Sequence, residues 1–546
     1  MISKLFNSQS KTITFAAVLL AISALISRFL GLIRDRLLAG RFGAGQELDI
    51  YFTAFRIPDF VYGILIMGGV AAVFLPVFSE YFKKDETGEK AWQFTSNLLN
   101  CFLVLLVLIC SVLVVLTPWI IDLIAPGFSQ ASRELTVKLT RIMFLSPILF
   151  GLSSVFSGVL HYFNRFLAYA FAPVLYNLGI IFGIIFLVPV FGLAGLAYGV
   201  ILGAFFHLII QIPAARNSGW KYLPLLNFKN FGLIKLFQLM VPRTIGSAAY
   251  HINLIVITAI ASTLTTGSIA IFNLANNLQY FPIGLIGVSF SVAAFPVLSK
   301  NWAAGLKQDF LKTFSTTFRQ ILFLIMPTCF LIFILRAQIV RIVLGTGEFG
   351  WLETRLTAAL LGIFALSVFS VSFVTFLAKV FYSFQDTKTP VLISLISMGL
   401  NIILCFLFVF LLTDNNFFKD FLVGFLKLEQ IKDVRLIGLP LALSVASIFQ
   451  FCLLLIFLRQ KMKGFQTREI LTCFWKTIVA CLIMAVSAYF SLWLVSQFLE
   501  MKTVFSVLIQ TMITCLFALF VYLSVSVFLK ASEIKIIWSA IFHGKK

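Results

Sequence analysis

The stretch from residue 27 to residue 80 combines an apolar composition with ionisable side chains. Its charges include Arg28, Arg34, Asp35, Arg36, Asp49, Arg56 and Asp59. A charge at the middle of a bilayer costs about 2.5–3.5 kcal/mol on insertion scales, so such residues normally face a protein interior or a watery cavity. Charges on consecutive hydrophobic segments therefore predict a polar cavity lined by helices.

Arginine is the residue type that suggests what this cavity binds. Arg28, Arg56 and Arg243 lie within apolar segments and have no acid next to them in the sequence, and Arg34 lies toward the end of the first segment. A guanidinium group stays charged when it is desolvated, and its rigid fork of donors matches a phosphate group. These arginines predict binding of an anionic group.

A structural role for the same charges is the alternative, and the sequence leaves it open. Arg28 or Arg34 could pair with a nearby acid and pin the first two helices together. The candidate acids are Asp35, Asp49 and Asp59. Asp59 lies one turn after Arg56, which makes it a candidate partner for that guanidinium.

A neutral polar series marks a later segment, at residues 267–297. Asn273, Asn276 and Asn277 share one face of the predicted helix by their spacing, and Gln279 follows before Pro282. We expect these side chains to line the same cavity. Prolines here and in the second segment predict bends, because proline frees a backbone carbonyl inside a helix.

Catalytic and metal-binding patterns are missing from the sequence. The four histidines have no metal-ligand spacing, and we find no Gly-rich phosphate loop and no nucleophile beside a base. We predict that the chain is not an enzyme and needs no metal or cofactor. A membrane potential or an ion gradient then supplies the work. The cysteines mostly lie in apolar runs, which predicts buried, unpaired thiols.

The composition sets the protein class. Hydrophobic residues make up 60% of the 546 residues and charged residues 12%, against about 25% charged in soluble proteins. The chain is predicted to be a polytopic helical membrane protein. The net charge of +21 lies mainly in short connections between apolar runs, as the positive-inside rule expects, so we predict no nucleic-acid partner.

Fourteen apolar segments are long enough to span a bilayer. They lie near residues 12–35, 49–77, 93–118, 134–158, 167–190, 192–214, 232–262, 267–297, 311–335, 354–378, 389–412, 436–458, 473–497 and 504–529. Lys and Arg are more frequent in the even-to-odd connections and at the ends of the chain than in the other connections. This bias predicts that both termini are cytoplasmic.

An internal repeat divides these segments. FLPVFSE at 74–80 matches AFPVLSK at 294–300, and the region around Pro173 resembles the region around Pro390. We therefore predict two related six-helix lobes, residues 1–225 and 226–465, followed by two extra helices in residues 466–546. Repeats of this kind place a substrate site between the lobes, near the middle of the membrane.

Several motifs resemble one known family. SRFLGLIRD, FGAG, AFRIPDF and FLPVFSEY, followed by FNRFLAYAFAPVLYN, FPIGLIGVSF and FYSFQDTKTPV, are similar in order to landmarks of the MurJ/MviN-type lipid II flippases. The likeness extends over roughly residues 15–530. It implies fourteen helices in the fold of the multidrug/oligosaccharidyl-lipid/polysaccharide exporters, with two lobes in a V around a central cationic cavity. The last two helices are then expected to form a groove for the lipid tail.

The resemblance also implies a substrate and partners. The substrate is lipid II, a disaccharide-pentapeptide on undecaprenyl pyrophosphate, and the partners are membrane lipids and cell-wall synthesis proteins. The protein is expected in the bacterial inner membrane. The head group would move to the outer leaflet by alternating access, for peptidoglycan assembly.

Some cavity positions follow the family pattern and others depart from it. The resemblance implies that Arg28, Arg34, Asp35 and Asp49 fall on motif positions that the family uses in or near the cavity. It places Arg56 on a basic position before the proline of the second helix. Where the family has two arginines and an acid, this chain has Tyr62, Asn277 and Met67, respectively. The hypothesis is that Arg56 and Arg243 supply replacement charge.

Other functions remain open on sequence grounds. One alternative is a flippase for another undecaprenyl-pyrophosphate-linked glycan, of O-antigen or capsule type. Another is a multidrug exporter of the same superfamily, which would favour unpaired acids over arginines in its cavity.

Overall fold

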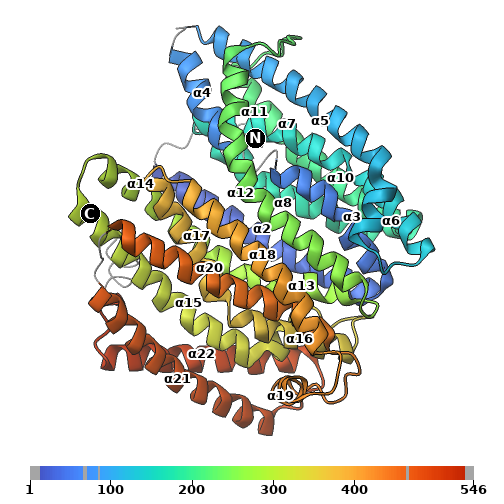
Figure 1. The fold of residues 1–546 in the computed structure, drawn as a ribbon, viewed down its shortest axis with the longest axis vertical. Coiled ribbons are helices and arrows are strands. Elements are labelled where there is room, and N and C mark those ends of the chain that lie inside the picture. The colour runs from blue at the N-terminus through green and yellow to red at the C-terminus, as the bar shows by residue number, and fades with distance from the viewer. Residues whose placement is uncertain (1–12, 65–70, 84–86, 463–466, 535–546) are drawn as a thin grey trace. The chain divides into compact units, whose positions relative to one another are not determined.

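The computed structural model describes residues 13–64, 71–83, 87–462 and 467–534, and all regular structure within these ranges is helical (Figure 1). Met67, one of the departures from the family pattern, lies outside the described residues. The chain divides into two compact units, residues 1–270 and 271–546. The predicted division into two lobes and a C-terminal pair stays a prediction.

The first unit contains long apolar helices joined by short connections. Its elements are α2 (Ile13–Phe42), α3 (Gln46–Tyr62), α4 (Ala71–Lys83), α5 (Glu89–Ile124), α6 (Gln130–Met143), α7 (Leu145–Tyr162), α8 (Phe166–Phe182), η2 (Gly183–Leu187), α9 (Val188–Phe191), α10 (Ala194–Ile209), α11 (Gln211–Arg216) and α12 (Phe231–Ser262).

The second unit continues from α13, whose first residues belong to the first unit. Its elements are α13 (Ser268–Pro282), η3 (Ile283–Val288), α14 (Ser289–Ala303), α15 (Lys307–Val343), α16 (Trp351–Ala365), α17 (Val368–Ser383), α18 (Lys388–Leu411), α19 (Phe417–Leu426), η4 (Arg435–Ile437), α20 (Gly438–Met462), α21 (Thr467–Phe498) and α22 (Val504–Phe528).

Ten helical stretches of the described chain are long and apolar enough to cross a membrane, and α16 with α17 makes an eleventh candidate. The span predicted for residues 354–378 falls on α16 and α17, which meet at a bend of 46°. The hydroxyl of Ser367, at the bend, donates to the carbonyl of Phe364 at 3.0 Å. Such local bonds compete with helical ones. The chain is a multi-pass membrane protein.

Each unit has its own aromatic core. Phe74, Phe78 and Phe94 are fully buried in the first unit, and Phe314 and Phe376 stack at 5.7 Å in the second. Helices α8 and α10 approach each other through glycines, since a Cβ at Gly179 would meet the Cα of Gly203 at 2.3 Å. Small residues allow membrane helices this close contact.

The cysteines test one prediction about burial. All eight are free, and six are buried, but Cys515 is half-buried and Cys452 is exposed. The burial prediction is therefore wrong for Cys452. The polar residues of α20 do not gather on one face, so the sequence does not tell which of its faces packs inside the protein.

Candidate functional site

Arg34 is held between α2 and α8. Its Nε and Nη2 donate to Oδ1 of Asp35 at 3.0 and 2.8 Å, and its Nη1 donates to Oδ1 of Asn177 at 3.3 Å. The Asn177 amide in turn donates to the carbonyls of Ser27 and Pro173. Asn177 thus ties α8 to α2 and fixes the position of the guanidinium.

The pairing with Asp35 does not use every donor of Arg34. The two side chains are 22% and 5% exposed. A guanidinium has five N–H donors, and the contacts to Asp35 and Asn177 account for three of them. Arg34 is therefore a positioned, partly neutralised cation.

Arg56 is buried in α3 and interacts with α12. Its Nε donates to Oγ1 of Thr258 at 2.7 Å, and Thr258 donates in turn to the carbonyl of Leu254. A Cβ at Gly63 would lie 1.8 Å from Nε2 of His251. Gly63 follows the last residue of α3, two turns after Arg56, and Thr258 lies two turns after His251 on α12. The two helices therefore run antiparallel along one face.

Electrostatic interactions join these groups into one polar cluster. Asp59 is half-buried one turn after Arg56, and its charge acts on both Arg56 and Arg34. Tyr176 of α8 lies near Asp59, Arg34 and two tyrosines of α3. We call this set the α2–α3–α8 cluster, and its members are Arg34, Asp35, Tyr51, Arg56, Asp59, Tyr62, Tyr176 and Asn177.

Asp49 has a different environment. Its carboxylate accepts the backbone N–H groups of Gly267 at 2.6 Å and Ala270 at 2.8 Å. It is 4% exposed. An acid at a helix N-terminus satisfies amides that have no partner within the helix. Asp49 thus connects the start of α3 to the start of α13.

The other predicted site residues are spread along the chain. Arg28 is half-buried on α2, before the cluster. Arg243 lies in α12, but its side chain is outside the described ones. In the second unit, Asn273 and Asn276 are buried and Asn277 is half-buried. Their helix, α13, ends at Pro282 and continues as the wider π-helix η3.

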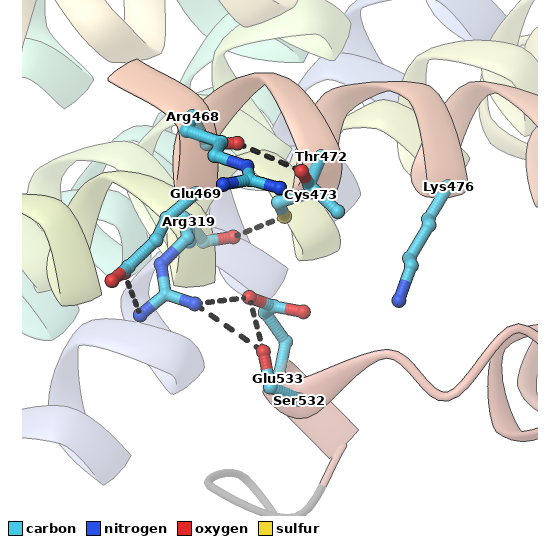
Figure 2. A pocket seen from close by; sticks show the side chains of 8 residues that line it. All are labelled: Arg319, Arg468, Glu469, Thr472, Cys473, Lys476, Ser532 and Glu533. Atoms are coloured by element: carbon cyan, nitrogen blue, oxygen red, sulfur yellow. Dashed lines mark hydrogen bonds and ion pairs between the residues drawn. The ribbon is translucent and has the colours of Figure 1, made fainter. Parts of the chain in front are cut away.

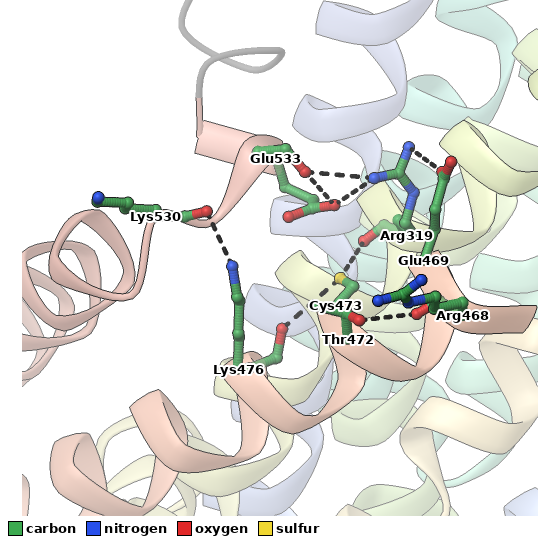
Figure 3. Close-up of polar contacts among 10 residues, drawn as sticks. Arg319, Arg468, Glu469, Thr472, Cys473, Lys476, Lys530 and Glu533 are labelled. Atoms are coloured by element: carbon green, nitrogen blue, oxygen red, sulfur yellow. Dashed lines mark hydrogen bonds and ion pairs between the residues drawn. The ribbon is translucent and has the colours of Figure 1, made fainter.

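A second polar site lies where α15, α21 and the segment after α22 meet, around a cavity of about 220 Å³. Arg319 forms ion pairs with Glu533 at 2.9 Å and with Glu469 at 3.2 Å, and Figure 2 shows it between the two acids. Lys476 donates to the carbonyl of Lys530 at 3.0 Å (Figure 3). We call this the Arg319 pocket.

Sequence reasoning missed several members of both sites. Asn177 and Thr258 lie in apolar helices far along the chain from the arginines that they contact. A polar side chain within an apolar run could have marked them as candidate site residues. Such side chains are common in these segments, however, so this feature does not single out Asn177 or Thr258. Arg319 lies in α15 and Glu533 in the segment after α22, so nothing in their spacing predicts their contact.

The chemistry of the α2–α3–α8 cluster is that of a binding site. Two fixed guanidinium groups can attract an anion, while the tyrosine hydroxyls and the amide can donate to and accept from uncharged groups. Among the described residues, no group of histidines, cysteines and acids could hold a metal ion.

Comparison with known protein families gives one match that extends over most of the chain. The family model described as lipid II flippase MurJ matches residues 38–510.

Relatives with curated names agree with this match. A probable lipid II flippase MurJ of Buchnera aphidicola subsp. Schizaphis graminum is 31% identical over 481 residues, which cover 87% of this chain and 88% of that protein. A probable lipid II flippase MurJ of Buchnera aphidicola subsp. Acyrthosiphon pisum is 32% identical over 385 residues, covering 70% and 75%.

Solved structures show the same fold. A lipid II flippase MurJ in an inward closed conformation has a TM-score of 0.74 at 24% identity, covering 94% of this chain and 99% of that one. An inward-facing MATE-family multidrug resistance transporter of the MOP superfamily has a TM-score of 0.63 at 15% identity, covering 82% and 99%.

Proposed function

This chain belongs to the lipid II flippase MurJ family, and on that premise we propose that it moves lipid II across the bacterial inner membrane. The head group travels from the cytoplasmic to the outer leaflet, where it serves peptidoglycan assembly. Lipid II and the surrounding membrane lipids are its small-molecule partners, and cell-wall synthesis proteins are its protein partners.

The single observation that carries the binding step is the placement of Arg34 and Arg56 among apolar helices. Both guanidinium groups are positioned by hydrogen bonds, to Asn177 and Thr258 respectively. A hydrogen bond to a charged group contributes about 1.5–3 kcal/mol net. A few such bonds to the pyrophosphate are enough to bind the head group. Because they are few, the head group can still dissociate.

The acids and tyrosines of the cluster moderate this binding. Asp35 and Asp59 partly neutralise the two arginines. The pyrophosphate therefore competes with these carboxylates for the guanidinium groups, and the carboxylates stabilise the arginines again after the pyrophosphate is released. Tyr51, Tyr176 and Tyr62 offer hydroxyl groups that suit sugar hydroxyls.

The test is transport of labelled lipid II by the purified chain in liposomes. Arg34→Gln and Arg56→Gln each remove one positive charge, and we expect the initial rate to fall on the order of tenfold or more for each, as one lost charge-assisted bond implies. Arg216→Gln is the matched control, because Arg216 is exposed at the end of α11. Wild-type rates in both cluster variants would remove the proposed site.

The remaining predicted site residues extend this proposal. Arg28, Asn273, Asn276 and Asn277 contact the head group during its passage, and Arg243 supplies charge that Tyr62 and Asn277 do not. Arg243→Ala should then fail to rescue cells depleted of their own flippase at normal expression. Full rescue by this variant would show that Arg243 is dispensable.

Two architectural features complete the proposal. The chain crosses the membrane fourteen times, with both termini in the cytoplasm, and its two six-helix lobes form a V that opens alternately to each side. The eleven candidate spans, together with α2, the α3–α4 pair and α12, support that count. Reporter fusions that are active only in the cytoplasm, attached at each terminus, test the orientation.

The lipid tail stays outside the lobes, along α21 and α22. These helices pack against each other and expose large apolar side chains, among them Phe490, Trp493, Phe505 and Phe520. An apolar surface of this kind suits a polyprenyl chain in the membrane. The membrane potential or an ion gradient supplies the work.

A further inference from the structure

A cavity of about 550 Å³ lies at the other end of α15 from the Arg319 pocket. Small-molecule sites typically measure about 300–1,000 Å³. The end of α15, the start of α16 and residues near the start of α22 form its walls. Its lining includes Gln338, Arg341, Trp351, Arg355 and Gln510. We call it the Arg341 cavity.

Neutral groups hold both arginines of this cavity in place. Arg341 Nη2 donates to the carbonyl of Lys502 at 3.0 Å. Arg355 donates to the carbonyl of Lys427 and to the side chain of Gln430, and its guanidinium carbon lies 4.5 Å from the centre of the Trp351 ring. These contacts fix the side chains without cancelling their charge.

The charge balance separates this cavity from the Arg319 pocket. The smaller pocket contains two acids, and both pair with Arg319. No acid is among the described residues that line the Arg341 cavity, although the Glu353 carboxylate lies near Gly350 in its wall. Neither of its arginines forms an ion pair with any residue that the structure describes. Two fixed guanidinium groups that form no ion pair among the described residues favour an anion, and phosphate in particular.

The cavity is also placed to meet lipid head groups. At about 1.5 Å per residue, Arg341 lies about 33 Å along a straight α15 from Arg319, close to the roughly 30 Å of a hydrocarbon core. The two sites therefore lie near opposite membrane surfaces. Trp351, which is 58% exposed, is a residue type that concentrates at such surfaces. In the proposed orientation, the Arg341 cavity faces the outer leaflet.

We propose that the Arg341 cavity binds the phosphate group of a lipid in the outer leaflet, and that during transport it receives the diphosphate of the translocated lipid. This inference rests on the proposed function for its orientation and its substrate. Because α22 contributes to both the cavity and the proposed tail surface, a lipid whose tail lies along α22 can reach Arg341 with its head group.

Photocrosslinking locates such a ligand directly. The probe is a prenyl diphosphate with a diazirine on the isoprene unit next to the phosphates, added to the full chain in phosphatidylcholine nanodiscs. We expect crosslinks in residues 345–355 and 501–510. Arg341→Gln and Arg355→Gln should each lower their yield about tenfold. Lys432→Gln, which removes an exposed charge elsewhere on the same proposed side, should leave the yield unchanged.

Competitors identify the source of the phosphate. If undecaprenyl diphosphate displaces the probe at a lower concentration than phosphatidylglycerol does, the ligand is the translocated lipid. If both displace the probe at the same concentration, the cavity binds lipid phosphate in general. Displacement by inorganic pyrophosphate at equal or lower concentration overturns the lipid assignment. Equal crosslinking in wild type and in both arginine variants overturns the site.

Two further measurements keep the outcomes distinct. Arg355 also anchors the segment at 427–430, so loss of crosslinking in Arg355→Gln could reflect misfolding. Arg355→Lys keeps the positive charge and controls for this. It should retain more crosslinking than Arg355→Gln. Transport of lipid II is measured separately. A chain that transports lipid II without arginine-dependent crosslinking refutes this inference alone, whereas arginine-dependent crosslinking without lipid II transport refutes the proposed function alone.

Discussion

Glu533 is the most deeply buried acid of the second unit's ion pairs, at 2% exposure of its side chain. It joins the segment after α22 to Arg319 of α15, and it accepts the hydroxyl of Ser532 at 3.0 Å. Removing one partner of a buried pair leaves the other charge uncompensated, which is the costly outcome.

We expect Glu533→Gln to lower the free energy of unfolding by about 1–3 kcal/mol. The loss is below that of an isolated buried pair because Glu469 still pairs with Arg319. Thermal unfolding in detergent measures it. Glu500→Gln is the control, since Glu500 pairs with Lys502 at 78% and 82% exposure, and exposed pairs contribute about 0–1 kcal/mol. Equal melting temperatures for both variants would contradict this account.

At the residue scale, the sequence shows which charges lie in apolar segments but not which groups contact them. Pairing of Arg34 with an acid that pins the first two helices together was one of two open interpretations. The structure contains an Arg34–Asp35 pair, but both residues belong to α2, so this pair does not join α2 to α3. Asn177, which positions the same guanidinium from α8, could not be foreseen. Asp49 illustrates the same limit, because its partners are backbone amides and no side-chain pattern marks them. Its role in substrate binding stays a prediction.

At the scale of helices and their connections, the start of α13 depends on one close backbone contact. Gly267 has a φ of 89°, and a Cβ there would lie 1.9 Å from the carbonyl oxygen of Ala44, in the turn between α2 and α3. Its N–H also donates to Asp49. Backbone on both sides of this contact leaves little room for adjustment.

Gly267→Ala should therefore destabilise the protein by more than the cost of its φ alone, which is about 1–2 kcal/mol for a non-glycine residue. Gly305→Ala separates the two effects, because Gly305 has a φ of 71° but nothing within 4 Å of an added Cβ. We expect thermal unfolding to show a clearly larger loss for Gly267→Ala. Similar losses in the two variants would mean that the contact with Ala44 yields easily.

The connection between α17 and α18 carries a titratable cap. Asp386 accepts the N–H and the hydroxyl of Thr389 at the start of α18, and it pairs with Lys461 of α20 at 2.6 Å. Burial alone would raise the pKa of Asp386, but the hydrogen bonds from Lys461 and Thr389 outweigh it and hold the pKa below its usual value.

A lowered carboxyl pKa sets the direction of the pH effect. The stabilisation is fully present above the unfolded-state pKa of about 3.9 and is lost as the pH falls through the lower folded value. Because Lys461 is 37% exposed, we expect only about 0.5–1 kcal/mol. Thermal unfolding of Asp386→Asn should differ from wild type at pH 7, and the two should converge as the pH falls below about 3.9. Asp414→Asn, at an exposed position, should show no such convergence.

At the scale of the whole molecule, the composition was enough to predict a membrane protein. Long apolar runs can be recognised in the sequence without knowing which residues contact each other. The bend between α16 and α17 was not predictable in the same way. Ser367 lies at this bend, and its hydroxyl also accepts from Ser444 of α20 at 3.0 Å, a contact that the sequence does not show. The repeat, the V of two lobes and the orientation of the termini stay predictions, since they concern the arrangement of parts rather than the helices themselves.

The energy source is a further property of the whole molecule. The pyrophosphate of lipid II carries about two negative charges, and each elementary charge moved across 100 mV corresponds to about 2.3 kcal/mol. The cell interior is negative, so outward movement of this head group runs down the potential and gains about 5 kcal/mol per 100 mV. We propose that the membrane potential drives transport in this way, with the cluster arginines remaining on the protein.

Proteoliposomes with a potassium gradient and valinomycin test this sign. We expect lipid II transport to accelerate when its starting side is negative and to slow when the potential is reversed, on the order of tenfold per 100 mV if about a third of the charge movement precedes the barrier. Proton and sodium gradients at zero potential form the control. Equal rates at both signs, with acceleration by one of these gradients, would identify an ion as the driving force. Arg34→Gln should retain the voltage dependence at a lower rate, because the moving charge belongs to the lipid.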